Sequence, residues 1–293
     1  MEMMFTNENS GYPYDHNNPE YIKPEDVDKY TLADYGFTVD AVKANHFGMD
    51  VTDPRTGEYL PDAFYESKIE AAIAQAEKRL DIVILPRILT EHHDFYRNDY
   101  QSYMYIHTHS KPILQLEDVR LEYGGNTIYK YPARWWRVNN LAGHVQMLPN
   151  MALSGGQNDL SLVQAYSSYP MISGLPYTVG SNYAPQMFHV TYIAGMLPPK
   201  RRGVTAPLEM HPDLWNLVIK MALKEVFEQW GRLILGAGIA NMSIQMDGIS
   251  QSIDTTQSAM YGGASADIVQ LNEDIEGLVA GLKAYYGVNL GLI

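Results

Sequence analysis

Cysteine is absent from this 293-residue chain. A chain without thiols has no disulfide scaffold, no cysteine nucleophile, no thiolate zinc site and no cysteine-held iron–sulfur cluster. Phenylalanine is also scarce, with 7 residues against 22 tyrosines. Much of the large apolar surface therefore carries a hydroxyl group, as is common on surfaces that contact other proteins.

Basic residues are few as well. Lys and Arg total 21 against 34 Asp and Glu, which gives a formal charge of −13 at pH 7. A protein that binds nucleic acid without sequence preference draws most of its affinity from basic side chains that neutralise phosphates. The one dense basic run is Lys200–Arg202, so binding of this kind is not expected. An acidic wall along which DNA moves without adhering is compatible with the charge.

Long hydrophobic runs are missing too. No stretch approaches the ~20 apolar residues that a transmembrane helix needs. Residues 1–7 lack the basic region and apolar block of a signal peptide, and no internal repeat recurs at solenoid periods. The sequence therefore predicts a soluble protein with no membrane partner.

Hydrophobic periodicity is weak over residues 1–60, which are polar, acidic and interrupted by prolines. We expect an extended N-terminal arm with one short helix near Pro24–Asp34, because proline and acidic residues suit a first helical turn. The remaining chain divides into the first part of a helical core (61–110), an inserted antiparallel β region with a long loop (111–204), the second part of the core (205–286) and a C-terminal docking tail (287–293).

Three helices are predicted for the core. Apolar residues recur at helical spacing over 62–80 and 265–286. The helix predicted over 214–230 is apolar on most sides, which requires burial in the chain's own fold or against a neighbouring copy. Residues 231–263 are small and glycine-rich, and predict a turn followed by an irregular loop.

The inserted region has the two-residue period of strands. Runs 112–123 and 127–131 flank Gly124-Gly125-Asn126 and predict a β-hairpin. We further expect a short β-branched strand at 81–87 stopped by Pro86, a turn or short strand at 90–96, and strands at 134–138, 144–148 and 187–194. The predicted fold class is α+β: a small α-helical core of three main helices, an inserted antiparallel β region, and extended N- and C-terminal arms.

Histidines provide the best candidate for a metal site. His92-His93-Asp94 and His107-Thr108-His109 each hold two imidazoles, and an HxH pair on a strand places both on one face. The alternative is that these are surface or interface histidines, because no HExxH helix is present. Neither a complete GxGxxG turn nor a GxSxG motif is found. We therefore predict no catalytic residue, no bound metal and no cofactor, and keep a metal-dependent hydrolase using His107 and His109 as an alternative.

Aromatic clusters allow another alternative. A sugar-stacking platform could be formed by Trp135 and Trp136 with Tyr129 and Tyr131, and by Tyr166, Tyr169, Tyr177 and Tyr183. A tail or baseplate module that binds carbohydrate would use such a surface. Cross-strand aromatic residues also pack sheets together, and tyrosines in loops often line protein contacts.

Two stretches resemble a known family. The first is Lys68–Leu80 with its Ala76-Glu77 pair, followed by Ile84-Leu85-Pro86-Arg87; the second is Asp247–Asp254, a DGxSxS-type loop before the closing helix. Together they resemble the head–tail connector (adaptor, or head-completion) proteins of tailed bacteriophages.

The resemblance implies a structural virion protein located in the neck between capsid and tail. Its implied partners are further copies in a ring of twelve, the portal protein, and a tail or stopper protein. DNA is expected to pass through the lumen without sequence-specific binding. An apolar helix and an apolar terminus fit this expectation, because both need neighbours.

The predicted contacts fall into two groups. The portal-docking residues are Tyr285, Tyr286, Val288, Leu290, Leu292 and Ile293. The inter-subunit residues are Trp215, Met221, Phe227, Trp230, Tyr166, Tyr169 and Tyr177.

Overall fold

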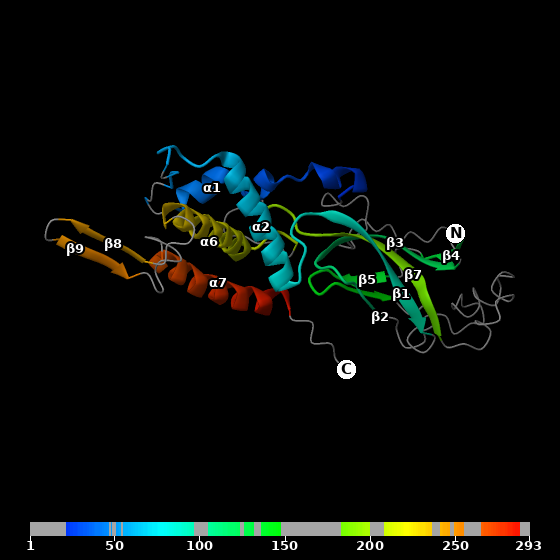
Figure 1. The fold of residues 1–293 in the computed structure, drawn as a ribbon. Coiled ribbons are helices and arrows are strands. Elements are labelled where there is room, and N and C mark those ends of the chain that lie inside the picture. Colours follow the sequence, from blue (N-terminus) through cyan, green and yellow to red (C-terminus); the bar gives the residue numbers. More distant parts are fainter. Residues whose placement is uncertain are drawn as a thin grey trace, which may run out of the picture.

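The structure is a computed structural model with an α+β fold, as the sequence predicts. It describes residues 22–46, 48, 51–53, 55–96, 105–123, 126–131, 136–147, 183–199, 208–235, 241–246, 249–254 and 265–287. The three long helices form one half of the molecule and the two larger sheets form the other (Figure 1). Within the described residues, no helix is both long enough and apolar enough to cross a bilayer.

Three long helices form the helical half, with boundaries close to those predicted. They are α2 (Asp62–Leu80), α6 (Pro212–Leu235) and α7 (Ser265–Tyr286). The apolar stripes of α2 and α7 are buried and face α6. Helix α6 therefore lies in the centre of the helical core, which explains why its sequence is apolar on most sides.

The described part of residues 22–60 packs against both halves of the fold, although the sequence predicts an extended arm. It forms two 3₁₀ helices, η1 (Pro24–Lys29) and η2 (Leu32–Tyr35), and a short helix α1 (Val39–Ala44). Tyr35 is 1 % exposed and donates a hydrogen bond to the carbonyl of Met196 at 2.7 Å. Ile22 and Val27 pack against Leu114, Ile193 and Leu197 beside the sheet, whereas the buried apolar residues from Tyr35 onward belong to the helical core.

The strand half contains two antiparallel sheets. One has the order β1 (Arg87–Tyr96), β7 (Tyr183–Ala194), β3 (Ile113–Tyr123) and β4 (Asn126–Lys130); the other has the order β2 (Tyr105–His107), β6 (His144–Met147) and β5 (Trp136–Asn139). A shared hydrophobic cluster that includes Leu121, Trp136 and Phe188 joins the two sheets. The predicted hairpin and the three further strands are confirmed.

Two local predictions are wrong, and for a third the structure confirms the strand alternative but extends it. Residues 82–86 form no strand, because the Ile84 N–H donates to the Glu77 carboxylate at 2.8 Å and not to a strand ladder. Residues 90–96, predicted as a turn or short strand, belong to the ten-residue strand β1. The segment 231–263 holds the end of α6 and a hairpin of β8 (Asn241–Met246) with β9 (Ile249–Asp254), which lies at the far end of the helical half (Figure 1).

Candidate functional site

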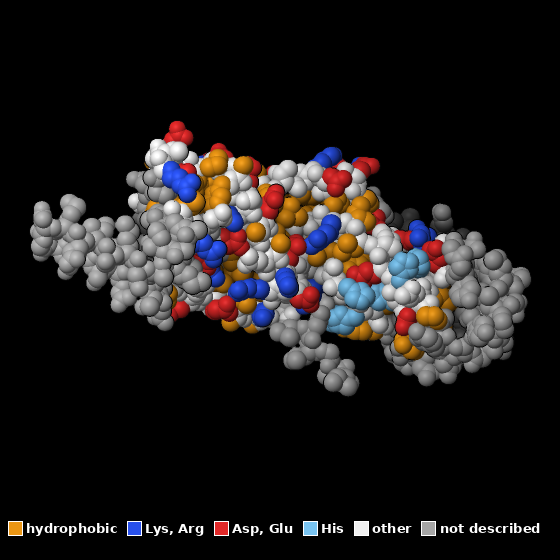
Figure 2. Space-filling model, viewed as in Figure 1, with side chains coloured by type: hydrophobic (Ala, Val, Ile, Leu, Met, Phe, Trp, Pro, Cys, Tyr) orange, Lys and Arg blue, Asp and Glu red, His pale blue; other side chains and the backbone are white. Residues whose placement is uncertain are grey.

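Histidine side chains gather on the surface of the strand half (Figure 2). Six of the chain's 9 histidines form three ring-to-ring pairs there. The pairs are His92 with His189, His93 with His109, and His107 with His144, whose ring centroids lie 3.8, 5.3 and 4.1 Å apart.

Strand register creates two of these pairs. His92 stands opposite His189 in the β1–β7 ladder, and His107 stands opposite His144 in the β2–β6 ladder. Burial first, and then the neighbouring imidazole, lowers the pKa of both His189 and His144. Both shifts favour the neutral imidazole, because burial disfavours the charged ring and a second positive charge beside it disfavours that form further.

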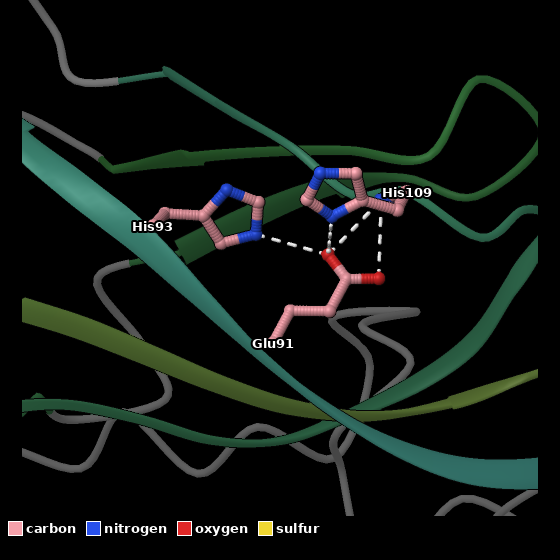
Figure 3. A group of neighbouring side chains, drawn as sticks. All are labelled: Glu91, His93 and His109. Atoms are coloured by element: carbon pink, nitrogen blue, oxygen red, sulfur yellow. Dashed lines mark hydrogen bonds and ion pairs between the residues drawn. The ribbon is translucent and has the colours of Figure 1, made fainter. Parts of the chain in front are cut away.

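The third pair converges on a carboxylate. Glu91 and His93 are two residues apart on β1 and face the same side, towards the turn that follows β2. The rings of His93 and His109 both point at the same oxygen of the Glu91 carboxylate (Figure 3). His93 Nε2 is 3.0 Å and His109 Nδ1 is 2.9 Å from Glu91 Oε2.

Hydrogen bonds hold this group in place. Tyr192 of β7 is fully buried and donates its hydroxyl hydrogen to Glu91 Oε1, while the Ser110 N–H donates to the same hydroxyl at 3.2 Å. The His109 N–H also donates to the carboxylate, at 3.0 Å from Oε2. Thr108 fixes the turn through its hydroxyl, which donates to the Gly143 carbonyl at 2.9 Å.

The charge state of Glu91 follows from these contacts. Burial alone would raise its pKa, but the hydrogen bonds from His93, Tyr192 and His109 outweigh burial and lower the pKa to about 2. Burial and the adjacent Glu91 charge raise the pKa of Tyr192. The pair is therefore a carboxylate with a protonated phenol donating to it.

This lowered pKa predicts a pH-dependent stability. The ionised Glu91 stabilises the fold fully above its ordinary pKa of 4.5, and this contribution is lost as the pH falls towards 2. The difference in unfolding free energy between wild type and Glu91→Gln should therefore shrink as the pH falls. Urea unfolding in the presence of EDTA, from neutral pH to about pH 2.5, measures this difference.

Glu70→Gln is the matched control, because Glu70 is exposed on α2. This variant should follow the wild-type pH profile. A Glu91→Gln difference that stays constant across the range would show that the carboxylate charge is not what stabilises the site.

The structure separates the predicted HxH pair. His107 contacts His144, with their Nε2 atoms 2.8 Å apart, whereas His109 contacts Glu91. The two imidazoles therefore belong to different clusters, and the hydrolase alternative loses its proposed ligand pair. Likewise, His92 and His93 point to opposite faces of β1, as successive strand residues do.

Sequence reasoning missed Glu91 and Tyr192. The alternation in β1 places Glu91 on the same face as His93, and this signal is visible once 90–96 is assigned as a strand. Tyr192 gives no such signal, since its role depends on the antiparallel pairing of β7 with β1.

Trp136 does not form a surface platform, contrary to the carbohydrate alternative. Its side chain is 1 % exposed and packs edge-on against Tyr131, with ring centroids 5.5 Å apart. The ring of Tyr131 in turn stacks on Phe188 at 6.0 Å. These aromatic residues hold the two sheets together, and Trp135 lies outside the described residues.

Several predicted inter-subunit residues have partners within the chain. Met221 and Phe227 are 3 % and 0 % exposed in the helical core, so they are not available to a neighbouring copy. The indole N–H groups of Trp215 and Trp230 donate to the carbonyls of Gly36 and Thr52, at 3.0 and 2.9 Å. Both tryptophans are partly buried, and Tyr166, Tyr169 and Tyr177 lie outside the described residues.

The predicted portal-docking residues lie at the end of α7. Tyr286 is 3 % exposed, and its hydroxyl approaches Met196 Sδ at 3.5 Å, whereas Tyr285 is 41 % exposed. Just beyond them, the ammonium of the buried Lys111 donates to the Gly287 carbonyl at 2.9 Å. Val288, Leu290, Leu292 and Ile293 lie outside the described residues.

A small pocket lies among α2, α6 and α7. Its volume is about 110 Å³, and its lining includes Arg79, Lys224 and Glu228. Sites for drug-sized ligands usually measure about 300–1,000 Å³, so this pocket is too small for such a ligand.

Comparison with known proteins finds similarity to solved structures. No protein-family model and no curated protein matches the chain. Among solved structures, it is similar to a chain from the neck of an empty gene transfer agent (GTA) particle, a phage-like particle, computed with C6 symmetry. The similarity covers 79 % of this chain and 90 % of that chain, with 15 % identity and a TM-score of 0.38. Values this low do not by themselves establish a shared fold or role.

Proposed function

We propose that this chain is a structural protein of the neck of a phage-like particle. Copies form a closed ring, twelve in number as the connector resemblance implies, between the portal and a tail or stopper protein. DNA passes through the ring. The role is mechanical and needs no catalytic residue, metal or cofactor for DNA passage.

The fixed position of the end of α7 carries this proposal. Tyr286 is anchored in the helical core, and Lys111 of the strand half holds the Gly287 carbonyl. The apolar residues Val288, Leu290, Leu292 and Ile293 follow at once. Both halves of the fold therefore fix the point at which a docking segment begins. A connector that reaches a portal requires such a fixed starting point.

Energetics explain why such a segment suits a ring. Ordering residues 287–293 costs about 7–14 kcal/mol of backbone entropy, and burying their four large apolar side chains returns about 6–12 kcal/mol. One copy would dock marginally. Many copies presented by one ring to a symmetric partner bind durably through their high effective concentration.

Neighbouring copies need an exposed contact surface, and the edge strand β1 offers one. It is the edge strand of the four-stranded sheet, with Ile88 44 % and Tyr96 45 % exposed. Ring contacts are heterologous, so one face of each copy meets a different face of the next. We propose this edge as one of the two faces, in place of the buried Met221 and Phe227.

The net charge of −13 fits a DNA conduit, because an acidic lumen does not hold phosphates. We propose that the residues facing the lumen are mainly acidic or neutral. Mostly basic lumen residues in the assembled ring would contradict this part of the proposal.

Removal of residues 288–293 tests the docking role. We expect the shortened chain to fold with an unchanged melting temperature and to form rings, but to lose binding to the portal protein. Native mass spectrometry of each chain, alone and mixed with portal, measures both ring formation and portal binding.

A matched control replaces residues 288–293 with glycine and serine and so keeps the chain length. It should fail to bind portal as the shortened chain does, because the apolar side chains are what dock. Wild-type portal binding by either variant would contradict the docking role, and a full chain that stays monomeric at all concentrations would contradict the ring.

A further inference from the structure

We propose that Glu91, His93 and His109 form a binding site for one divalent transition-metal ion, with Zn²⁺ as the best fit. The ion would connect the edge strand β1 to the turn after β2. This inference is independent of the proposed neck function, because it concerns the stability of the strand half.

The geometry suits a metal ion of this size. One ligand atom from each residue lies within 4.8 Å of the other two. Zn²⁺ binds imidazole nitrogen and carboxylate oxygen at about 2.0–2.2 Å, which places tetrahedral ligands about 3.4 Å apart. The two nitrogen–oxygen distances are 3.0 and 2.9 Å, so each needs to widen by only about 0.5 Å.

The donor set selects the class of metal. Two imidazoles with one carboxylate form a borderline set, and such sets favour Zn²⁺ and its neighbours over Ca²⁺ and Mg²⁺, which prefer oxygen ligands throughout. When the ion binds, it takes the place of the hydrogen atoms that His93 Nε2 and His109 Nδ1 direct at Glu91. The proton of each neutral ring then occupies its other nitrogen.

The surrounding hydrogen bonds already orient the carboxylate as metal sites require. Tyr192 donates to Oε1, while Oε2 faces the two imidazoles (Figure 3). Residues that hydrogen-bond to a metal ligand without touching the metal hold that ligand in position and increase metal affinity. The buried tyrosine is itself fixed by the Ser110 N–H.

Exposure defines the route by which the ion enters. The side chains of Glu91 and His93 are 12 % and 15 % exposed, whereas that of His109 is 75 % exposed. The site is thus closed towards the sheet and open on the His109 side. Water would occupy the fourth coordination position there.

Metal titration of the untagged full chain tests the proposal. Calorimetry with Zn²⁺, after treatment with EDTA and dialysis, should show one ion bound per chain. His93→Ala and His109→Ala should each weaken binding at least ~100-fold, because loss of a direct ligand costs at least as much as loss of an outer one. The melting temperature of wild type should rise with Zn²⁺ concentration, and those of the two variants should not.

Neighbouring histidines provide matched controls. His92→Ala removes the adjacent residue on the opposite face of β1, and His107→Ala removes the other histidine of the HxH motif. Both should bind Zn²⁺ as wild type does. Circular dichroism checks that each variant is folded. Because the His109 side chain is highly exposed, its substitution should not disturb folding.

Three results would overturn the proposal. The wild type could bind no Zn²⁺ at stoichiometric level. His93→Ala could bind Zn²⁺ as tightly as wild type. His107→Ala could lose the ion together with His109→Ala, which would assign it to the HxH pair.

Discussion

Replacing Phe227 with alanine is expected to lower the free energy of unfolding by about 3–5 kcal/mol. Phe227 is fully buried in the helical core, and its ring lies 6.0 Å from that of the buried His46. Removal of the ring leaves a cavity that the packed helices around α6 cannot readily fill. Urea unfolding followed by circular dichroism measures the loss.

The same variant distinguishes two explanations of why α6 is apolar on most sides: burial by its own chain, or burial by a neighbouring copy. If α6 is buried by its own chain, the loss is the same at all protein concentrations. A loss that appears only at concentrations where rings form would assign Phe227 to an interface after all. Leu233→Ala is the matched control, because Leu233 is on the same helix but 40 % exposed, and it should change stability by less than about 1 kcal/mol.

Replacing Gly195 with alanine is expected to lower the free energy of unfolding by about 2–5 kcal/mol. Gly195 has a φ of 132°, which side-chain-bearing residues rarely adopt, and an added Cβ would lie 2.7 Å from Pro86 Cα. Because this contact is with backbone, no rotation of a side chain can relieve it. Urea unfolding measures the effect.

Gly48→Ala isolates the contribution of the contact. Gly48 also has positive φ, at 82°, but no atom lies within 4 Å of an added Cβ. The free energy of unfolding of this variant should fall only by the cost of the strained backbone, about 1–3 kcal/mol. Equal losses at the two positions would show that contact with Pro86 adds nothing.

Gly195 lies where the two halves of the fold meet. Its N–H donates to the Pro112 carbonyl at 3.0 Å, and the Met196 N–H donates to the Ile84 carbonyl at 3.0 Å. Tyr35 and Tyr286 contact Met196 from the helical side. A disturbance at this junction is therefore expected to affect the helical core and the sheets together.

The helices were predictable because local periodicity determines them. Residues 265–286 show one apolar stripe, and α7 spans those residues. The two-residue alternation of the predicted hairpin was equally local. The strand β1 was not predictable in full, because its apolar alternation is interrupted by polar Glu91 and His93, which serve the site.

The candidate site needed the tertiary structure. Sequence spacing alone groups His107 with His109, yet strand register gives His107 to His144 and leaves His109 to Glu91. His109 and Glu91 are 18 positions apart. Their contact depends on how the two sheets lie relative to each other, which sequence spacing does not show.

By itself, the sequence determined the fold class, the three long helices, the β-hairpin, the acidic charge and the apolar segment 288–293, because composition and short-range periodicity encode them. Only the tertiary structure decided that α6 is buried by its own chain, that Trp136 joins two sheets, and that three histidine pairs form. These features depend on pairing between distant segments, where a change of one residue in strand register turns every side chain to the opposite face.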